Sequence, residues 1–227
     1  MKLSKGDSKI KGFRSGKFIR YYFGSKEIRA HIDAVHAAPP CSDKFTGEIV
    51  EGVVKKINCC GIIAIVSRCE ANLNRPRSKK NKDAIDEYRY IIQKIQEHIN
   101  NLDKNRKALK PYLHLAIHGM SNKWNIDMEI GTLEGKTCSI NVKNWFINEI
   151  KNRNEIIKNL QMDTRFHGNI SKSVHRCGYS INSTDYLGYG KNFNTFQVEI
   201  SRTLREYYRD KIIDMFSDII INFNRTF

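Results

Sequence analysis

Long apolar runs are missing from this sequence of 227 residues, and none approaches the roughly 20 residues that a membrane-spanning helix needs. The first residues, Met1 to Asp7, are polar and contain no apolar core of the kind that marks a secretion signal. We therefore expect a globular, soluble protein without a membrane segment, and we predict a cytoplasmic location.

Paired cysteine motifs are missing as well. The six cysteines form no Cys-x-x-Cys pair and no zinc-ribbon spacing, and Cys59 and Cys60 are adjacent. This pattern argues against a zinc ribbon and against a disulfide framework, so in a reducing cytoplasm we expect free, mostly buried thiols. These thiols belong to Cys41, Cys59, Cys60, Cys69, Cys138 and Cys177.

Acidic residues are scarce relative to basic ones. The chain has 24 Asp and Glu against 39 Lys and Arg, which gives a formal net charge of +15. Such a surplus indicates either an anionic partner or a composition generally rich in lysine. The basic residues are spread along the chain with one local cluster, Arg75–Lys82. A nucleic-acid-binding protein that uses this cluster is the alternative, but no helix-turn-helix, zinc-finger or RNP pattern supports it.

The apolar pattern predicts strands that alternate with helices. We predict strands over 18–23, 28–35, 62–66, 113–117, 126–130 and 196–200, and helices from about 42–46, over 84–107, over 142–160 and from Ser201 through Phe216. This alternation predicts an α/β fold with a mixed central sheet flanked by helices. We expect a basic N-terminal lead-in over 1–17 and a single domain over 18–227.

Three polar residues lie where such a fold places its chemistry. His36 ends one predicted strand, His118 ends another, and Glu199 lies inside an otherwise apolar strand. Because ligands collect at the carboxyl ends of strands in α/β sheets, two imidazoles and a carboxylate arriving there suit a catalytic zinc site. A single histidine at a strand end is more often structural, so the prediction depends on the pair.

A catalytic zinc site needs a third protein ligand. Glu48 and Glu51 lie on the helix after the His36 loop, and an acid in the first turns of that helix can point back to the strand end. We favour Glu48 because it is nearer the helix start, and we keep Glu51 as the alternative. Each is otherwise an ordinary solvated side chain.

A possible substrate anchor follows the strand over 62–66. Asn74 and Arg75 open the basic loop there, and an arginine in this position can bind a substrate carboxylate through two parallel hydrogen bonds. The alternative is a solvated loop arginine.

With these residues in place, the chain resembles the N-formylglutamate amidohydrolase family, whose fold is similar to that of the zinc carboxypeptidases (phosphorylase/hydrolase-like). The matching segments follow one another in the family's order. They are Ala34-Val35-His36-Ala37-Ala38, Asn72-Leu73-Asn74-Arg75-Pro76, Ala116-Ile117-His118-Gly119-Met120, Asp127-Met128-Glu129-Ile130-Gly131-Thr132 and Gln197-Val198-Glu199-Ile200-Ser201-Arg202.

The resemblance implies a role for each matched residue. His36 and His118 would bind one Zn²⁺ per chain, with Glu48 (or Glu51) as the third ligand and Glu199 as the general base. Asn74 and Arg75 resemble the pair that holds a substrate's terminal carboxylate, and the segment around His167 resembles the substrate-side loop. The implied activity is hydrolysis of an amide or peptide bond adjacent to a carboxylate, in a small acidic amide such as an N-acyl-glutamate, a γ-glutamyl chain or a peptide C-terminus.

The sequence also departs from the family pattern. Zinc carboxypeptidases use a compact His-x-x-Glu, whereas here the nearest glutamates are displaced by a proline-containing insertion, Ala37-Ala38-Pro39-Pro40. This departure concerns the third ligand and leaves the scheme of two histidines and a glutamate base intact.

Overall fold

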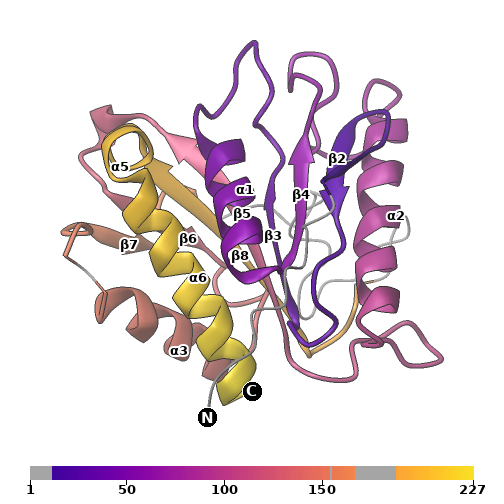
Figure 1. Ribbon diagram of the computed structural model, residues 1–227. Coiled ribbons are helices and arrows are strands. Elements are labelled where there is room, and N and C mark those ends of the chain that lie inside the picture. Colours follow the sequence, from indigo (N-terminus) through magenta and orange to yellow (C-terminus); the bar gives the residue numbers. More distant parts are fainter. Residues whose placement is uncertain (1–11, 154, 167–187) are drawn as a thin grey trace.

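A mixed eight-stranded sheet organises the chain in a computed structural model that describes residues 12–153, 155–166 and 188–227 (Figure 1). The order of its strands is β1-β2-β4-β3-β5-β8-β6-β7. The strands are β1 (Arg14–Ser15), β2 (Ile19–Tyr22), β3 (Ala30–Ala34), β4 (Cys60–Ala64), β5 (Tyr112–Met120), β6 (Met128–Gly131), β7 (Leu160–Met162) and β8 (Phe193–Ser201). The helices are α1 (Thr46–Ile57), α2 (Lys82–His98), η1 (Asn122–Trp124), α3 (Ile140–Lys151), α5 (Arg202–Tyr207) and α6 (Arg209–Thr226). The predicted mixed central sheet flanked by helices is confirmed.

The four central strands, β4, β3, β5 and β8, run parallel to one another. β2 and β6 pair with this core in antiparallel fashion, on β4 and β8 respectively. β5 and β8 share nine paired positions, from Tyr112 opposite Phe193 to Met120 opposite Ser201. The carboxyl ends of all four central strands therefore meet at one edge of the sheet, where an α/β fold places its ligands.

The two faces of the central strands differ in polarity because side chains alternate along a strand. On one face, Leu113, Leu115 and Ile117 of β5 belong to a core shared with α1, α3 and α6, which lie together on one side of the sheet in Figure 1. The other face carries His114 and His118 from the same strand, and α2 packs with the smaller core on that side. The polar side chains of the site therefore share the face opposite α1 and α6.

Three predicted helices differ in extent from the observed ones. The helix predicted over 84–107 ends at His98, where Asn100 takes a left-handed conformation (φ 54°) that an α-helix cannot continue. The helix predicted over 142–160 ends at Lys151, and Leu160 instead begins the edge strand β7. The last predicted helix is divided at Tyr208 into α5 and α6.

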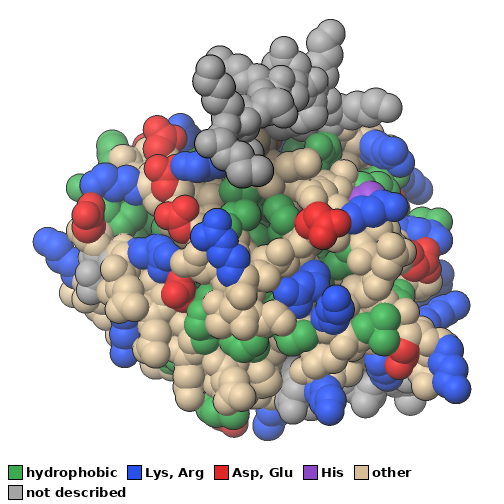
Figure 2. All heavy atoms as spheres, turned by 60° about the horizontal axis from the view of Figure 1, so that its bottom comes forward, with side chains coloured by type: hydrophobic (Ala, Val, Ile, Leu, Met, Phe, Trp, Pro, Cys, Tyr) green, Lys and Arg blue, Asp and Glu red, His purple; other side chains and the backbone are tan. Residues whose placement is uncertain are grey.

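Three further predictions concerned membrane-spanning segments, the N-terminal lead-in and the basic residues. No helix among the described residues is long and apolar enough to cross a membrane. β1 falls within the predicted lead-in 1–17 and pairs with β2, whereas residues 1–11 lie outside the described part. Figure 2 shows basic side chains scattered over one face, with acidic ones among them, rather than gathered in one patch.

Candidate metal centre

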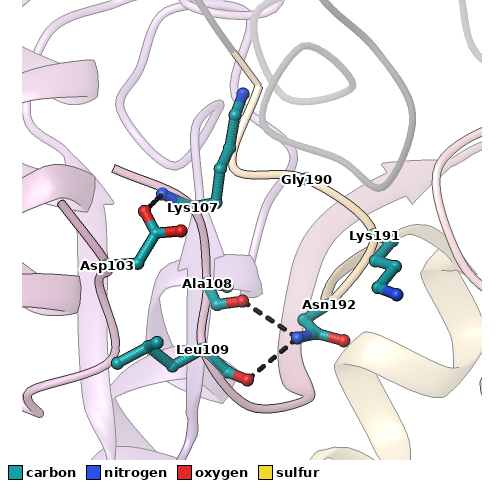
Figure 3. Close-up of a pocket in the computed structure, with 7 residues that line it drawn as sticks. All are labelled: Asp103, Lys107, Ala108, Leu109, Gly190, Lys191 and Asn192. Atoms are coloured by element: carbon teal, nitrogen blue, oxygen red, sulfur yellow. Dashed lines mark hydrogen bonds between the residues drawn. The ribbon is translucent and has the colours of Figure 1, made fainter. Parts of the chain in front are cut away.

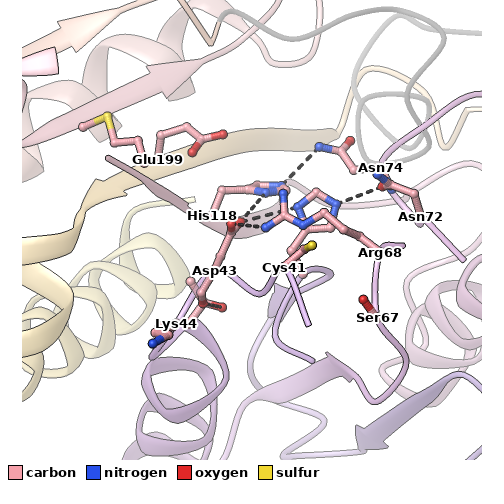
Figure 4. Close-up of polar contacts among 12 residues, drawn as sticks. Cys41, Asp43, Lys44, Ser67, Arg68, Asn72, Asn74, His118 and Glu199 are labelled. Atoms are coloured by element: carbon pink, nitrogen blue, oxygen red, sulfur yellow. Dashed lines mark hydrogen bonds and ion pairs between the residues drawn. The ribbon is translucent and has the colours of Figure 1, made fainter. Parts of the chain in front are cut away.

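Two histidines and an aspartate meet at the carboxyl edge of the sheet (Figure 4). His36 follows β3, His118 belongs to β5, and Asp43 lies in the loop that leads from His36 to α1. Asp43 Oδ2 lies 3.4 Å from His36 Nδ1 and 3.4 Å from His118 Nδ1. All three residues are buried, with exposed fractions of 4%, 2% and 7% for His36, His118 and Asp43. Two ring nitrogens and one carboxylate oxygen thus face one another in a nearly closed space.

Asp43 is held in place from several directions. Its backbone N–H donates to the carbonyl of His36 at 2.8 Å, so the loop folds back on the strand end. Its second carboxylate oxygen, Oδ1, accepts a hydrogen bond from Arg68 Nη2, in the loop after β4. Burial opposes ionisation of Asp43, but the imidazoles of His118 and His36 beside it outweigh burial and hold its pKa well below the usual range.

The far nitrogens of both rings face asparagine side chains. His36 Nε2 lies 2.9 Å from Asn72 Oδ1, so Nε2 donates there and Nδ1 keeps its lone pair toward Asp43. His36 Nδ1 has no hydrogen-bond partner. Asn74 Nδ2 lies 3.4 Å from His118 Nε2, and its buried Oδ1 has no partner. Turning this amide by half a rotation would let Oδ1 accept from Nε2 and free Nδ1 of His118 in the same way.

The predicted third ligand is not among these residues. α1 buries the face that carries Ile49, Val50 and Val53, and Glu48 lies on its exposed side. Glu51 is bound by Arg20 at 2.8 Å and by Lys55 at 2.6 Å. The structure therefore does not bring Glu48 or Glu51 to the histidines.

Asp43 takes the position for which a glutamate was predicted. The prediction concerned glutamates on the helix, whereas Asp43 precedes the first helical residue, Thr46. An acid inside the loop, seven residues after His36, was the available signal.

Glu199 lies on β8 directly opposite His118 in the parallel pairing of β5 and β8. It is 6% exposed, and its Oε1 accepts a hydrogen bond from Gln197 Nε2 at 3.0 Å. Both side chains share the polar face of the sheet, and Figure 4 shows Glu199 beside the histidine cluster. The predicted glutamate therefore lies next to the predicted metal ligand.

A second buried glutamate, Glu129 of β6, pairs opposite Glu199 across the antiparallel side. Its Oε1 accepts three backbone N–H groups, from Thr164 at 3.0 Å, Arg165 at 2.7 Å and Phe166 at 2.6 Å. Hydrogen bonds to an ionised acceptor are stronger than neutral ones. Glu129 therefore fixes the start of the segment that was predicted to form the substrate-side loop.

Arg205 of α5 ties the segments of the site together. It is 4% exposed, and its guanidinium donates to the carbonyls of Ile200 at 3.0 Å, of Met120 at 3.1 Å and of Lys44. Each carbonyl lies one or two residues after a member of the site. The guanidinium passes over Gly119, where a Cβ atom would lie 2.5 Å from Arg205 Cζ. The glycine is therefore needed for this close approach.

The two described residues that were predicted to bind substrate differ in burial. Asn74 is buried beside His118, whereas Arg75 is exposed and its Nη1 donates to the carbonyl of Asn74 at 3.0 Å. His167 lies outside the described residues. Arg68, which the sequence did not single out, places its guanidinium at the group formed by His36, Asp43 and His118, where it pairs with Asp43.

Another histidine–aspartate group lies deeper on the same face of the sheet. His31, Asp33 and His114 are fully buried, and His114 Nε2 lies 2.9 Å from Asp33 Oδ2. Tyr88 donates to the same oxygen at 2.6 Å, and the Tyr112 hydroxyl lies 2.9 Å from His31 Nδ1. Burial, helped by the neighbouring His114, lowers the pKa of His31 well below its usual value, so His31 is neutral.

Ring geometry separates the two groups. A metal bound by an imidazole nitrogen lies close to the plane of that ring, so two histidine ligands need ring planes that cross. The rings of His31 and His114 are stacked, 4.1 Å apart at 10°, and their planes do not meet near the nitrogens. The rings of His36 and His118 are at 73° with centroids 4.9 Å apart. Of these two groups in the described part of the chain, therefore, the one with Asp43 fits a metal ion.

A hollow of about 450 Å³ lies at the opposite end of the sheet, before the first residues of β5 and β8 (Figure 3). Asp103 and Lys107 border it on one side, and Asn192 crosses it to donate to the carbonyls of Ala108 and Leu109. The candidate metal centre lies at the other ends of these strands, so this hollow does not belong to it.

Comparison with solved structures identifies the fold as one that amide hydrolases use. The chain is similar to N-formylglutamate amidohydrolase from Ralstonia eutropha JMP134, with a TM-score of 0.64, 13% identity and coverage of 92% of this chain and 97% of that one. It is also similar to a bacteriophage poly-γ-glutamate hydrolase (TM-score 0.53, 13% identity, 92% and 91% covered) and to a gene product of Agrobacterium tumefaciens (0.61, 9%, 91% and 94%). No protein-family model and no curated protein sequence matches the chain.

The predicted resemblance to the N-formylglutamate amidohydrolase family is confirmed at the level of the fold. The nucleic-acid alternative finds no support. Part of its basic cluster is neutralised, because Arg77 and Lys82 both pair with Asp86 at 3.0 Å.

Proposed function

We propose that this chain is a zinc-dependent amidohydrolase in which His36, Asp43 and His118 bind the metal and Glu199 is the general base. The observation that carries the proposal is the convergence of two imidazole Nδ1 atoms on one buried carboxylate oxygen, each 3.4 Å away. A catalytic zinc has three such protein ligands and one position for water. The unpartnered Nδ1 of His36 is a buried polar atom that a metal would satisfy.

The surroundings of these ligands support a catalytic rather than a purely structural centre. The outer nitrogens of both histidines face amide side chains, as metal-binding histidines require for a fixed orientation. Arg68 neutralises the second oxygen of Asp43, so this carboxylate presents only Oδ2 to the centre. The described side chains provide three ligands of zinc type, and Glu199 lies on the adjoining strand.

When bound, zinc lowers the pKa of its water toward roughly 7 and polarises the scissile carbonyl. Glu199 would act as the general base; this is supported by its register opposite His118 and by the hydrogen bond from Gln197 that orients its carboxylate. It would accept the proton of the attacking water and pass it to the leaving amine. Gln197 also donates to the carbonyl of Phe166, which couples the base to the segment bound by Glu129.

The proposed substrate class rests on the net charge of the chain and on the substrates named for proteins of similar fold. The net charge of +15 favours an acidic substrate electrostatically. N-formylglutamate and poly-γ-glutamate, named in the similar structures, both present a carboxylate near the amide bond. We assign the carboxylate anchor to Asn74 and Arg75, with His167 as a further substrate-binding residue. The reaction is hydrolysis of an N-acyl-glutamate, a γ-glutamyl bond or a C-terminal peptide bond.

Elemental analysis of the purified protein tests the metal centre. Wild type should carry about one zinc per chain after reconstitution, and His118→Ala should carry none. His98→Ala, which removes a histidine bound to the Gly24 carbonyl away from the centre, is the matched control and should keep the metal.

Two further variants separate the candidate third ligands. Asp43→Asn should lose zinc, whereas Glu48→Gln should retain it. Retention by Asp43→Asn together with loss in Glu48→Gln would restore the first assignment. Wild type without metal after reconstitution, or zinc-independent hydrolysis of acyl-glutamate and γ-glutamyl substrates, would overturn the proposed function.

A further inference from the structure

Three consecutive residues after β4 each contact the loop that carries Asp43. Ser67 Oγ donates to the carbonyl of Pro40 at 2.5 Å, and Arg68 binds the carboxylate of Asp43. The third residue, Cys69, has its Sγ 2.9 Å from Sγ of Cys41. The two loops are thus joined at three successive points.

This cysteine pair differs from the other described cysteines. Cys41 and Cys69 are both exposed, whereas Cys59, Cys60 and Cys138 are buried. Exposure admits a small thiol or disulfide from solution to either sulfur. Most of the described thiols are buried, as predicted, and these two are the exceptions. Cys177 lies outside the described residues.

We propose that Cys41 and Cys69 form a reversible disulfide that joins the loop of the metal centre to the loop after β4. The sulfurs need to approach by somewhat less than 1 Å to reach the bond length of about 2.05 Å. Both lie in loops, where small backbone shifts cost little. The proposal stands on this geometry and does not depend on the bound metal.

A small disulfide such as oxidised glutathione supplies the oxidising power. One thiolate attacks it, forms a mixed disulfide and releases one reduced glutathione. The second protein thiol then attacks the protein sulfur of that mixed disulfide and releases the second glutathione. Two protein thiols lose two electrons and two protons, and one oxidised glutathione becomes two reduced molecules. A reducing thiol pool reverses both steps.

The consequence for the metal centre rests on the proposed function. A bond between Cys41 and Cys69 would fix the segment two residues before Asp43 against the segment that carries Arg68. Both partners of that ion pair would then be held in their metal-binding arrangement. We expect zinc to bind about tenfold more tightly to the oxidised form, the lower end of the effect of outer-shell groups on metal affinity.

Mass spectrometry after treatment with oxidised glutathione tests the bond. Wild type should lose two hydrogen atoms in mass without gaining glutathione, and non-reducing peptide mapping should recover a cross-linked pair that contains Cys41 and Cys69. Cys41→Ser and Cys69→Ser should instead retain one glutathione on the remaining cysteine. Cys138→Ser, which removes a buried thiol, is the matched control and should behave as wild type.

Two results would overturn the bond. One is wild type that carries separate glutathiones on Cys41 and Cys69, and the other is a bridge from either residue to a different cysteine. Zinc titration of oxidised and reduced wild type then tests the consequence. Equal affinities in the two forms would refute the effect on the metal centre and leave the bond intact. Failure of both forms to bind zinc would refute the proposed function, and the mass result would still stand.

Discussion

Replacing Gly119 by alanine tests how the guanidinium of Arg205 holds the site. The new methyl group would lie 2.5 Å from Cζ, 2.7 Å from Nη1 and 2.8 Å from Nη2 of Arg205, closer than packed atoms tolerate. The guanidinium is 4% exposed and donates to three carbonyls, so it cannot move aside without breaking some of these bonds. The substitution therefore forces either overlap or the loss of charged hydrogen bonds.

The expected change in the free energy of unfolding follows from the cost of overlap and the cost of lost hydrogen bonds. Overpacking in a buried site costs about 1–3 kcal/mol, and each lost hydrogen bond to a charged group costs about 1.5–3 kcal/mol. We expect Gly119→Ala to lower the free energy of unfolding by about 3 kcal/mol. For a chain of this length that corresponds to a fall in Tm of roughly 6–12 °C, at about 2–4 °C per kcal/mol. Urea denaturation and calorimetry measure both quantities.

A double-mutant cycle makes the test specific. Arg205→Met keeps the aliphatic stem but removes Cζ and both terminal nitrogens, so Gly119→Ala should cost less than about 1 kcal/mol in that background. Gly12→Ala is the control, because a Cβ atom there meets nothing within 4 Å and should change stability by no more than about 0.5 kcal/mol. A wild-type Tm for Gly119→Ala, or an equal penalty with and without the guanidinium, would refute the reasoning.

Three further substitutions probe the carboxylates of the site. Glu199→Gln should keep its zinc and its Tm but lose hydrolysis by a factor of at least about 100, the low end of general-base effects, and near-normal turnover would remove Glu199 from that role. Asp43 has a lowered pKa in the folded protein, so its ionised form stabilises the fold above the unfolded-state pKa of about 3.9, and this contribution fades as pH falls below that value. The difference in unfolding free energy between metal-free wild type and Asp43→Asn should therefore be full near pH 6 and shrink below about pH 4; a constant difference would contradict this. Glu129→Gln exchanges a charged acceptor of three N–H groups for a neutral one and should cost about 1–3 kcal/mol of unfolding free energy, which thermal denaturation would detect.

Local patterns in the sequence were sufficient for the parts of the site that lie on strands. Alternation of apolar and polar residues along β5 and β8 already separates His118 and Glu199 from the apolar face. His36 was recognised because it directly follows a strand of apolar character. Their placement at or on the strands agrees with the structure because side-chain direction on a strand is set by its two-residue period, which local sequence carries.

Loop residues were predicted less well. Glu48 was chosen for its distance from the helix start, but the loop between His36 and α1 brings Asp43 to the histidines instead. That loop is held by contacts with residues 67–69 and with Arg205, which are remote in sequence. No local pattern encodes such contacts, so the acid that lies beside the two histidines could not be derived from spacing alone.

The sequence by itself determined the α/β class, the places of the main strands along the chain and the two histidines and the glutamate that end or occupy them, because hydrophobic periodicity is a local property. The tertiary structure decided which acid joins the histidines, which of two histidine groups has ring planes that a metal can share, and which two cysteines meet. These depend on crossing angles and loop contacts between segments far apart in the chain, and only the packed fold brings them together.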